Sequence, residues 1–353
     1  MSDVLVVSLG TTHGLRVADN MLIAMLHEAG VSAEAFGVRM GLANTLRRGY
    51  PLNDLVEAIA ARRALDTALQ KRGRPRAVVF STTTAALLAT RPGIPYAVRL
   101  DSPAALNRRG VPNAPVRALE RRSLARARLV IPMGDVGAAA LPAGSAAYQV
   151  VPVPINSSGD AGRPRDPELA VAYTPDPKAK GLELLCAAWA QVAGASRRME
   201  VFGIERGDAL AFLARRGVAE PAGLMFRGFV PAADFRAALR TARCFVSAAR
   251  WEDYGQAPLE ALRDGTMLVT APADGPYEAL AIARHLDRDL VARDFEPASL
   301  AAGIDAAYRR DRAFGDSYRH RAAVRLEPYE WPACVSALRT RVLPILLGES
   351  RSA

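Results

Sequence analysis

The chain has 353 residues, half of them hydrophobic and 23% charged, and this composition excludes an intrinsically disordered chain. At about 150 residues per domain, the length predicts two domains with a cleft between them. No apolar run approaches the ~20 residues of a membrane span and no secretory leader is recognisable, so we expect a cytoplasmic protein. The net charge is +10; residues 1–155 carry 19 basic and 10 acidic side chains (+9), against 27 and 26 (+1) in residues 156–353.

The first 155 residues alternate short apolar runs with helix-patterned stretches, the pattern of βαβ units around a parallel sheet. The predicted strands are 4–8, 76–80, 96–100 and 129–132. The predicted helices are 18–29, 52–71 and 114–127. Gly, Ser, Pro and Arg then dominate residues 156–168, which we interpret as a linker.

A second βαβ series occupies residues 169–325. Its predicted strands are 169–173, 199–202, 224–226, 244–247 and 268–270, and its predicted helices are 182–192 and 208–216. Residues 326–353 include a predicted helix over 329–347. Cys186, Cys244 and Cys334 lie far apart in apolar contexts, which indicates buried thiols and no metal site.

The densest cluster of unusual residues is the segment 250–260, directly after the predicted strand 244–247. The carboxyl edge of a parallel strand is where ligands bind in doubly wound sheets. Gly255 and Pro258 suit a helix start whose free amides attract an anion. Glu252 on the loop and Glu260, expected in the first turn, can hold sugar hydroxyls. Alternatively, Glu260 is only a favourable charge at a helix N-terminus.

Two of the three lysines of this arginine-rich chain, Lys178 and Lys180, lie in the loop after the predicted strand 169–173. An ammonium group at a strand-to-helix turn suits a diphosphate. For Lys180, beside Gly181 at a helix start, we favour this function. For Lys178 a solvated surface position is an equal alternative.

The order and spacing of these residues resemble the donor half of family-4 retaining glycosyltransferases (glycosyl transferases group 1) over roughly residues 169–310. The resemblance rests on the following residues: Lys180, Gly181, Arg250, Glu252, Gly255, Glu260, Gly265, Gly275 and Glu278. It also includes the segment 226–230, which is similar to the family's loop against the nucleotide base.

The resemblance implies the GT-B fold, an α/β architecture of two Rossmann-like domains in which the closing helix crosses back onto the first domain. It implies a retaining enzyme that moves a hexose-type sugar from a nucleoside-diphosphate donor. Lys180 and Arg250 would neutralise the diphosphate, Glu252 would hold the transferred sugar and Glu260 the ribose. The donor site would also include Lys178, Val230, Tyr254, Gly255 and Gln256.

One departure from the family is the pair Thr174–Pro175, where an arginine usually precedes the lysine. Lys178 is a candidate replacement, and Arg250 is another. This departure concerns efficiency or donor choice more than the reaction class.

The acceptor side is less well marked. Residues 10–14 form a glycine-bearing loop after the first strand, in which Gly14 would approach the donor phosphates. His13 would contact an acceptor hydroxyl, or it would be only an exposed loop residue. Asp101 would orient the acceptor, or it would be only a polar residue of its loop. In the retaining mechanism that the resemblance implies, the leaving phosphate can take the acceptor proton. No Asp-x-Asp motif follows a strand, so we expect no metal and no cofactor.

The first domain carries an arginine-rich stretch that we expect to be opposed only by Glu120. It consists of Arg108, Arg109, Arg117, Arg121, Arg122, Arg126 and Arg128. It predicts either a solvated helix face or a surface for an anionic, lipid-linked acceptor at a membrane. Nucleic acid is a poorer partner because aromatic residues for base stacking are sparse there. A sugar-nucleotide epimerase, an inactive scaffold and a nucleic-acid-modifying glycosyltransferase are the competing functions.

Overall fold

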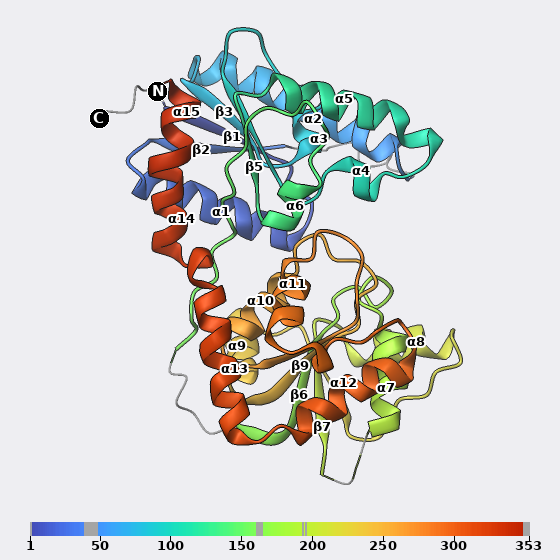
Figure 1. The fold of residues 1–353 in the computed structure, drawn as a ribbon. Coiled ribbons are helices and arrows are strands. Elements are labelled where there is room, and N and C mark those ends of the chain that lie inside the picture. Colours follow the sequence, from blue (N-terminus) through green and yellow to red (C-terminus); the bar gives the residue numbers. More distant parts are fainter. Residues whose placement is uncertain (1, 39–48, 160–164, 193, 195, 349–353) are drawn as a thin grey trace. The chain divides into compact units, whose positions relative to one another are not determined.

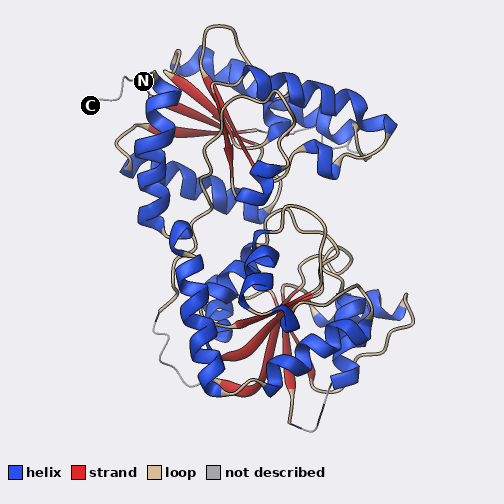
Figure 2. Cartoon of the chain, viewed as in Figure 1, coloured by secondary structure: helices blue, strands red, loops and turns tan. Residues whose placement is uncertain are grey.

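The computed structural model describes residues 2–38, 49–159, 165–192, 194 and 196–348. It divides into unit 1, made of Met1–Pro154 and Pro328–Ala353, and unit 2, made of Ile155–Glu327. Each unit is a parallel five-stranded sheet flanked by helices (Figures 1 and 2). Within the described ranges, none of the helices combines the length and apolar character that crossing a membrane requires.

In unit 1 the strand order is β2-β1-β3-β4-β5. The strands are β1 (Val4–Ser8), β2 (Ala33–Gly37), β3 (Ala77–Phe80), β4 (Tyr96–Leu100) and β5 (Leu129–Pro132). The helices are α1 (His13–Glu28), α2 (Leu52–Arg72), α3 (Thr83–Ala86), α4 (Ala104–Asn107), a 3-10 turn (Val111–Asn113), α5 (Ala114–Arg126) and α6 (Asp135–Ala139). The C-terminal segment adds α14 (Trp331–Ala337), a π-helical turn (Leu338–Val342) and α15 (Leu343–Leu347).

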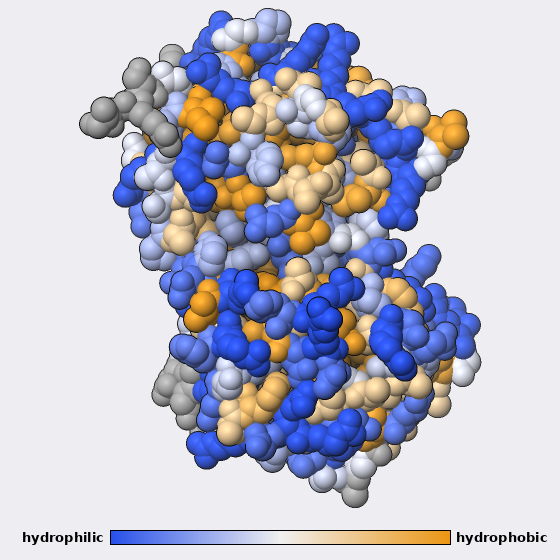
Figure 3. All heavy atoms as spheres, viewed as in Figure 1, coloured by the Kyte–Doolittle hydropathy of each residue, from blue (hydrophilic) through white to orange (hydrophobic). Residues whose placement is uncertain are grey.

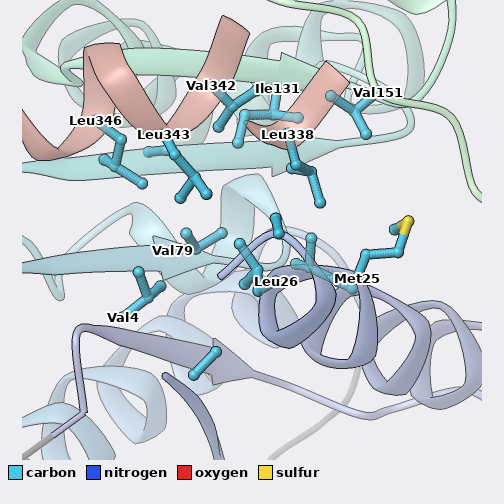
Figure 4. Close-up of a cluster of buried hydrophobic side chains, with 14 of the residues drawn as sticks. Val4, Met25, Leu26, Val79, Ile131, Val151, Leu338, Val342, Leu343 and Leu346 are labelled. Atoms are coloured by element: carbon cyan, nitrogen blue, oxygen red, sulfur yellow. The ribbon is translucent and has the colours of Figure 1, made fainter. Parts of the chain in front are cut away.

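Side chains alternate between the two faces of the unit 1 sheet, since successive residues of a strand point to opposite sides. Val4 and Val6 contribute to a core shared with α1, α14 and α15. Figure 4 shows part of this core, including Val4, Leu26 of α1 and Leu346 of α15. Leu5 and Val7 contribute to the opposite core, shared with α2 and α5. The two faces are therefore both buried, which explains the continuous apolar runs of these strands.

The C-terminal helical segment belongs to unit 1, which confirms the predicted return to the first domain. Leu338, Val342 and Leu346 are buried against the sheet face that α1 also covers. The segment is not the single regular helix expected over 329–347. Pro344 lacks an amide proton for the carbonyl one turn earlier, and a π-helical turn precedes it.

In unit 2 the strand order is β10-β9-β6-β7-β8. The strands are β6 (Asp166–Tyr173), β7 (Arg198–Phe202), β8 (Leu224–Gly228), β9 (Ala242–Ser247) and β10 (Met267–Thr270). The helices are α7 (Leu182–Val192), α8 (Arg206–Ala214), α9 (Ala232–Thr241), α10 (Gln256–Arg263), α11 (Glu278–Leu286), a 3-10 turn (Arg288–Leu290), α12 (Pro297–Arg309), α13 (Arg312–Arg325) and a 3-10 turn (Glu327–Tyr329).

Several elements differ from the expectations, including β2, α1 and β6. Strand β2 was not predicted, because as an edge strand it buries only Ala33 fully and lacks an apolar run. Helix α1 begins at His13 and not near Ala18, because the Thr12 side chain accepts a hydrogen bond from the Leu15 amide (3.2 Å) and caps the helix. Strand β6 begins at Asp166, inside the predicted linker 156–168.

The outer surface of unit 2 is mainly hydrophilic on the face that Figure 3 shows, with isolated apolar residues between the polar ones. The three cysteines are buried, as predicted. Burial raises the pKa of Cys186 and of Cys334 to about 12, so both thiols stay protonated at neutral pH.

Candidate functional site

The site in unit 2 lies at a reversal of strand order. From β6 the chain builds β7 and β8 on one side, then crosses to place β9 on the other side of β6. The loops that follow β6 and β9 therefore leave the same edge of the sheet in opposite directions, and this is where ligands bind in such folds. Lys180 lies on the first loop, and Glu252 lies on the second.

The loop after β6 is a tight turn organised by Asp176. Its carboxylate accepts hydrogen bonds from the amides of Lys178 (3.0 Å) and Ala179 (2.9 Å). Its carbonyl accepts one from the Lys180 amide (2.9 Å). Gly181 has a φ of +65°, and a Cβ there would lie 2.1 Å from the Ala248 carbonyl oxygen. Only glycine permits this approach of the loop to the end of β9.

Lys180 and Glu252 form an ion pair at the centre of the site, with 2.7 Å between Nζ and Oε1. The Glu252 side chain is 8% exposed and that of Lys180 is 25% exposed. Burial raises the pKa of the Glu252 carboxyl, and the Lys180 ammonium offsets part of that rise. The ammonium keeps access to solvent and can still meet a second anion.

The loop that carries Glu252 is held by the segment after β10. The Glu252 amide donates to the Asp274 carbonyl (3.0 Å), and the Asp274 amide donates to the Arg250 carbonyl (3.2 Å). At Gly275, whose φ is +101°, a Cβ would lie 2.3 Å from the Glu252 carbonyl oxygen. The backbone around Glu252 is thus held by residues 274 and 275.

Helix α10 begins at Gln256, after Gly255 in the left-handed conformation (φ 81°, ψ 54°). Pro258 is therefore the third helical residue and not the first, and Glu260 lies in the second turn and not the first. The amides of Gln256 and Ala257 belong to the first turn, which an α-helix leaves without intrahelical acceptors. Tyr254 is buried just ahead of them. A helix therefore starts after Gly255, as predicted, with these two amides at its N-terminus.

Glu260 is held by a partner that the sequence did not indicate. Its Oε1 lies 3.9 Å from Nη1 of Arg236 on α9 and accepts a hydrogen bond from Gln256 Nε2 (3.2 Å). Arg236 also binds the buried Asp264 carboxylate (2.6 and 2.8 Å). Burial nevertheless raises the pKa of Glu260. Glu260 thus has a positive neighbour on another helix, Arg236, and a hydrogen-bond donor on its own helix, Gln256.

The remaining donor-side candidates in these loops differ in exposure and in their polar partners. Arg250 is half exposed, with Nε 3.7 Å from Glu183 Oε1 and the guanidinium 5.4 Å from the Phe295 ring centre. Lys178 is exposed. Thr174, at the position of the missing arginine, is buried, and its hydroxyl has no hydrogen-bond partner.

Val230 is half-buried in the loop after β8, next to Phe229, which is 68% exposed. The Phe229 amide donates to Glu205 Oε1 (3.3 Å). Glu205, at the end of the loop after β7, was not singled out from the sequence, because no local pattern ties it to residues 226–230.

In unit 1 the loop after β1 is shorter than expected, because His13 and Gly14 belong to the first turn of α1. Gly14 is exposed. The prediction for the His13 side chain lies outside the described residues. Asp101 directly follows β4, and its carboxylate accepts a hydrogen bond from the Ser102 amide (2.6 Å). Ser8 donates to the buried Asp19 carboxylate and thereby ties α1 to the end of β1.

The arginine-rich stretch of unit 1 differs from the expectation that Glu120 alone opposes it. Glu120 is buried, and both its oxygens accept from the Ala104 amide at the start of α4 (2.9 Å each). Arg108 instead binds the buried Asp54 carboxylate (2.7 and 3.0 Å), from a distant part of the sequence. Arg128 donates to the Ile345 carbonyl (2.7 Å). The exposed arginines on α5 are Arg121, Arg122 and Arg126, while Arg109 and Arg128 are exposed outside this helix.

Taken together, the unit 2 site offers an ammonium, a guanidinium and two helix amides for an anion, beside two carboxylates for hydroxyl groups. Within the part of the chain that the structure describes, no group of three or more His, Cys, Asp or Glu side chains is placed to hold a metal ion.

A comparison with protein-family models finds a match within unit 2 of the chain. Residues 169–310 match the family model described as Glycosyl transferases group 1. Among curated proteins, none matches significantly. The fold is similar to that of sucrose-phosphate synthase from Thermosynechococcus elongatus (15% identity, 95% of this chain and 96% of that chain covered, TM-score 0.71).

Two further solved structures are similar over almost their whole length. They are a glycosyltransferase from Rickettsia africae (12% identity, 98% and 99% covered, TM-score 0.69) and HepE from Anabaena in complex with UDP-glucose (14%, 95% and 98%, TM-score 0.66). At such low identity the likeness shows the fold, and it confirms the predicted pair of Rossmann-like domains.

Proposed function

We propose that this chain, a glycosyltransferase of group 1 with the GT-B fold, transfers a hexose-type sugar from a nucleoside-diphosphate donor with retention of the anomeric configuration. The observation that carries the proposal is the 2.7 Å Lys180–Glu252 ion pair at the strand-order reversal of unit 2. The complex of HepE with UDP-glucose supports a nucleotide-sugar donor.

In this proposal the positive groups of the site bind the diphosphate. Lys180, Arg250 and the Gln256 and Ala257 amides stabilise the charge that grows on the leaving phosphate as the glycosidic bond breaks. Lys178 is exposed on the same loop and is a further candidate for a phosphate oxygen. The leaving phosphate takes the acceptor proton, so the site requires no separate base. We propose that the reaction uses no metal and no cofactor.

The carboxylates orient the sugars. Glu252 accepts hydrogen bonds from hydroxyls of the transferred sugar, and its ion pair with Lys180 couples sugar position to phosphate position. Glu260 holds the ribose hydroxyls, while Val230 and its neighbours lie against the base. Gly14, His13 and Asp101 of unit 1 are the residues that we propose for the donor phosphates and the acceptor.

The test begins with the donor. Thermal unfolding is measured with UDP, GDP, ADP and their sugars, since a ligand at 100 times its Kd stabilises by about 2.7 kcal/mol. With the donor identified, Glu252→Ala should bring transfer to background while circular dichroism stays unchanged. Glu327→Ala, which removes an exposed carboxylate elsewhere in unit 2, should transfer sugar at the wild-type rate. Wild-type turnover of Glu252→Ala would remove this residue from the site.

We further propose that the acceptor is anionic or lipid-linked and that α5 meets an acidic membrane surface. Arg121, Arg122 and Arg126 are exposed on this helix, and each can contribute ~1 kcal/mol to binding at such a surface. Wild-type protein should sediment with acidic vesicles and not with neutral ones, and added salt should weaken binding.

The matched variants compare the two faces of unit 1. Changing the three α5 arginines to glutamine should abolish binding to acidic vesicles. Arg339→Gln with Arg341→Gln removes exposed charges from the helical segment on the opposite sheet face and should preserve it. Equal loss in both variants would indicate a nonspecific charge effect, and no binding by wild type would favour a water-soluble acceptor.

A further inference from the structure

Unit 2 contains a pocket of about 980 Å³ that none of the proposed donor-site residues lines. It opens between α13, the end of α10 and the starts of three strands. Its charged lining residues are Arg165, Arg243, Arg263, Arg312, Arg319, His320, Asp311 and Asp316.

The pocket lies at the opposite edge of the sheet from the Lys180–Glu252 site. Arg165 immediately precedes β6, Arg243 is the second residue of β9 and Met267 is the first residue of β10. All strands of this sheet are parallel. Because Lys180 and Glu252 follow the other ends of β6 and β9, the length of the strands separates the two sites.

The pocket has an excess of positive charge. Five arginines less two aspartates leaves three positive charges at pH 7 with His320 neutral. Both aspartates already have partners, because Asp316 pairs with Arg319, and Asp311 caps α13 by accepting from the Phe314 amide (2.8 Å). The lining therefore still has three more positive than negative side chains after both aspartates are counted.

Two of the arginines converge on one glycine. At Gly265, whose φ is +76°, a Cβ would lie 2.6 Å from Cδ of Arg319 and 3.0 Å from Nη2 of Arg165. Arg165 is held there by the carbonyls of Ala242 (2.8 Å) and Asp264 (2.7 Å), which orient a guanidinium without cancelling its charge. Burial, with the nearby Arg319, lowers the pKa of Arg165 to about 10.

The Arg165 and Arg319 guanidinium groups are thus close enough to repel each other, and a bound anion would reduce this repulsion. The Asp264 and Asp316 carboxylates offset part of this repulsion at Arg165, but Asp264 is also engaged by Arg236. Pro167, Met267 and Ala323 add apolar surface to the lining. A pocket of this volume accommodates a small organic molecule as well as its charged group.

We propose that this pocket binds a phosphorylated small molecule, with its phosphate between Arg319, Arg312 and Arg165 and its organic part against Met267 and Pro167. Guanidinium groups pair with phosphate oxygens through two hydrogen bonds at once, which favours phosphate over a simple counter-ion. This site goes beyond the proposed transfer reaction and does not depend on it.

The experiment measures binding of inorganic phosphate and ribose 5-phosphate by calorimetry at constant ionic strength, with ribose as the uncharged control. Wild type should bind both phosphates and not ribose, and ribose 5-phosphate should bind more tightly than inorganic phosphate. Arg312→Gln with Arg319→Gln should weaken binding at least about tenfold, equivalent to about 1.4 kcal/mol.

Two variants serve as controls. Arg309→Gln removes an exposed arginine at the end of α12, outside the lining, and should bind like wild type. Lys180→Ala alters the proposed donor site and should also leave this binding unchanged. Loss of phosphate binding in Lys180→Ala with retention in the Arg312/Arg319 variant would place the anion in the donor site and overturn the proposal.

The thermal unfolding temperature of each variant shows whether a change in binding comes from a change in folding. Without phosphate, Arg319→Gln should unfold near the wild-type temperature, because the repulsion with Arg165 and the exposed ion pair with Asp316 are lost together. Arg312 is exposed in the first turn of α13, so Arg312→Gln alone provides a variant with little risk to the fold, and it should also weaken binding. Failure of wild type to bind either phosphate at millimolar concentration would refute the site.

Discussion

Removal of the Lys180 ammonium should separate its role in folding from its role in ligand binding. Lys180→Ala leaves the buried Glu252 carboxylate without the partner that lies 2.7 Å away. Breaking a fully buried pair costs about 3–5 kcal/mol, and the partial exposure of Lys180 reduces our expectation to about 2–4 kcal/mol. The affinity for the nucleoside diphosphate should fall by about 1.5–3 kcal/mol, or roughly 10- to 150-fold.

The stability loss should depend on pH in a defined direction. The folded-state pKa of Glu252 is raised, so its contribution to stability is fully present below the unfolded pKa of about 4.3 and is lost as pH rises through the folded pKa. Removing Lys180 raises the folded pKa further. Lys180→Ala should therefore be most destabilising above that pKa and approach wild type as the pH falls toward about 4.3.

Urea unfolding at several pH values and calorimetry with the identified nucleoside diphosphate measure the two effects. The double variant Lys180→Ala with Glu252→Gln should recover most of the stability at neutral pH, because no buried charge is left unpaired, yet it should not recover affinity. A stability loss that is the same at every pH, or affinity restored in the double variant, would refute this account of the ion pair.

Two further predictions concern the loop geometry and the proposed charge neutralisation. Gly181→Ala should destabilise by about 2–4 kcal/mol in chemical denaturation, because its Cβ would lie 2.1 Å from the Ala248 oxygen. Gly217→Ala, with a similar φ of +67° and open space around it, should lose only the ~1–2 kcal/mol of backbone strain, and equal losses would contradict a steric role. Transfer should persist in EDTA, because Lys180, Arg250 and the α10 amides provide the positive charge; inhibition by EDTA that magnesium or manganese reverses would show that a cation is required.

Much of the fold was predictable from local sequence. Strands β1, β4 and β5 and helix α7 have the predicted bounds, because buried parallel strands and a helix packed on a sheet leave clear apolar patterns. Strand β2 left no such pattern, since an edge strand with exposed residues resembles a loop. The start of α1 depends on one capping hydrogen bond of Thr12, which an apolar pattern does not record.

The identities of the candidate site residues were also accessible from the sequence. Lysines are rare in this chain, so Lys180 was conspicuous, and Glu252 and Glu260 lie within one short segment. Their partners were not accessible in the same way. Glu260 is held by Arg236 of another helix, and Arg108 is neutralised by Asp54 of α2, which reduced the basic face predicted on the first domain.

The sequence by itself therefore determined the parallel sheets, the loops that carry function and the residue types at their ends, because these depend on periodicity and on neighbours in the chain. The tertiary structure decided which charges meet. Lys180 and Glu252 are 72 positions apart, and they pair because the strand order reverses between β6 and β9. The convergence of Arg165 and Arg319 at Gly265 has the same origin, since only packing of α13 against the start of the sheet brings those side chains to one glycine.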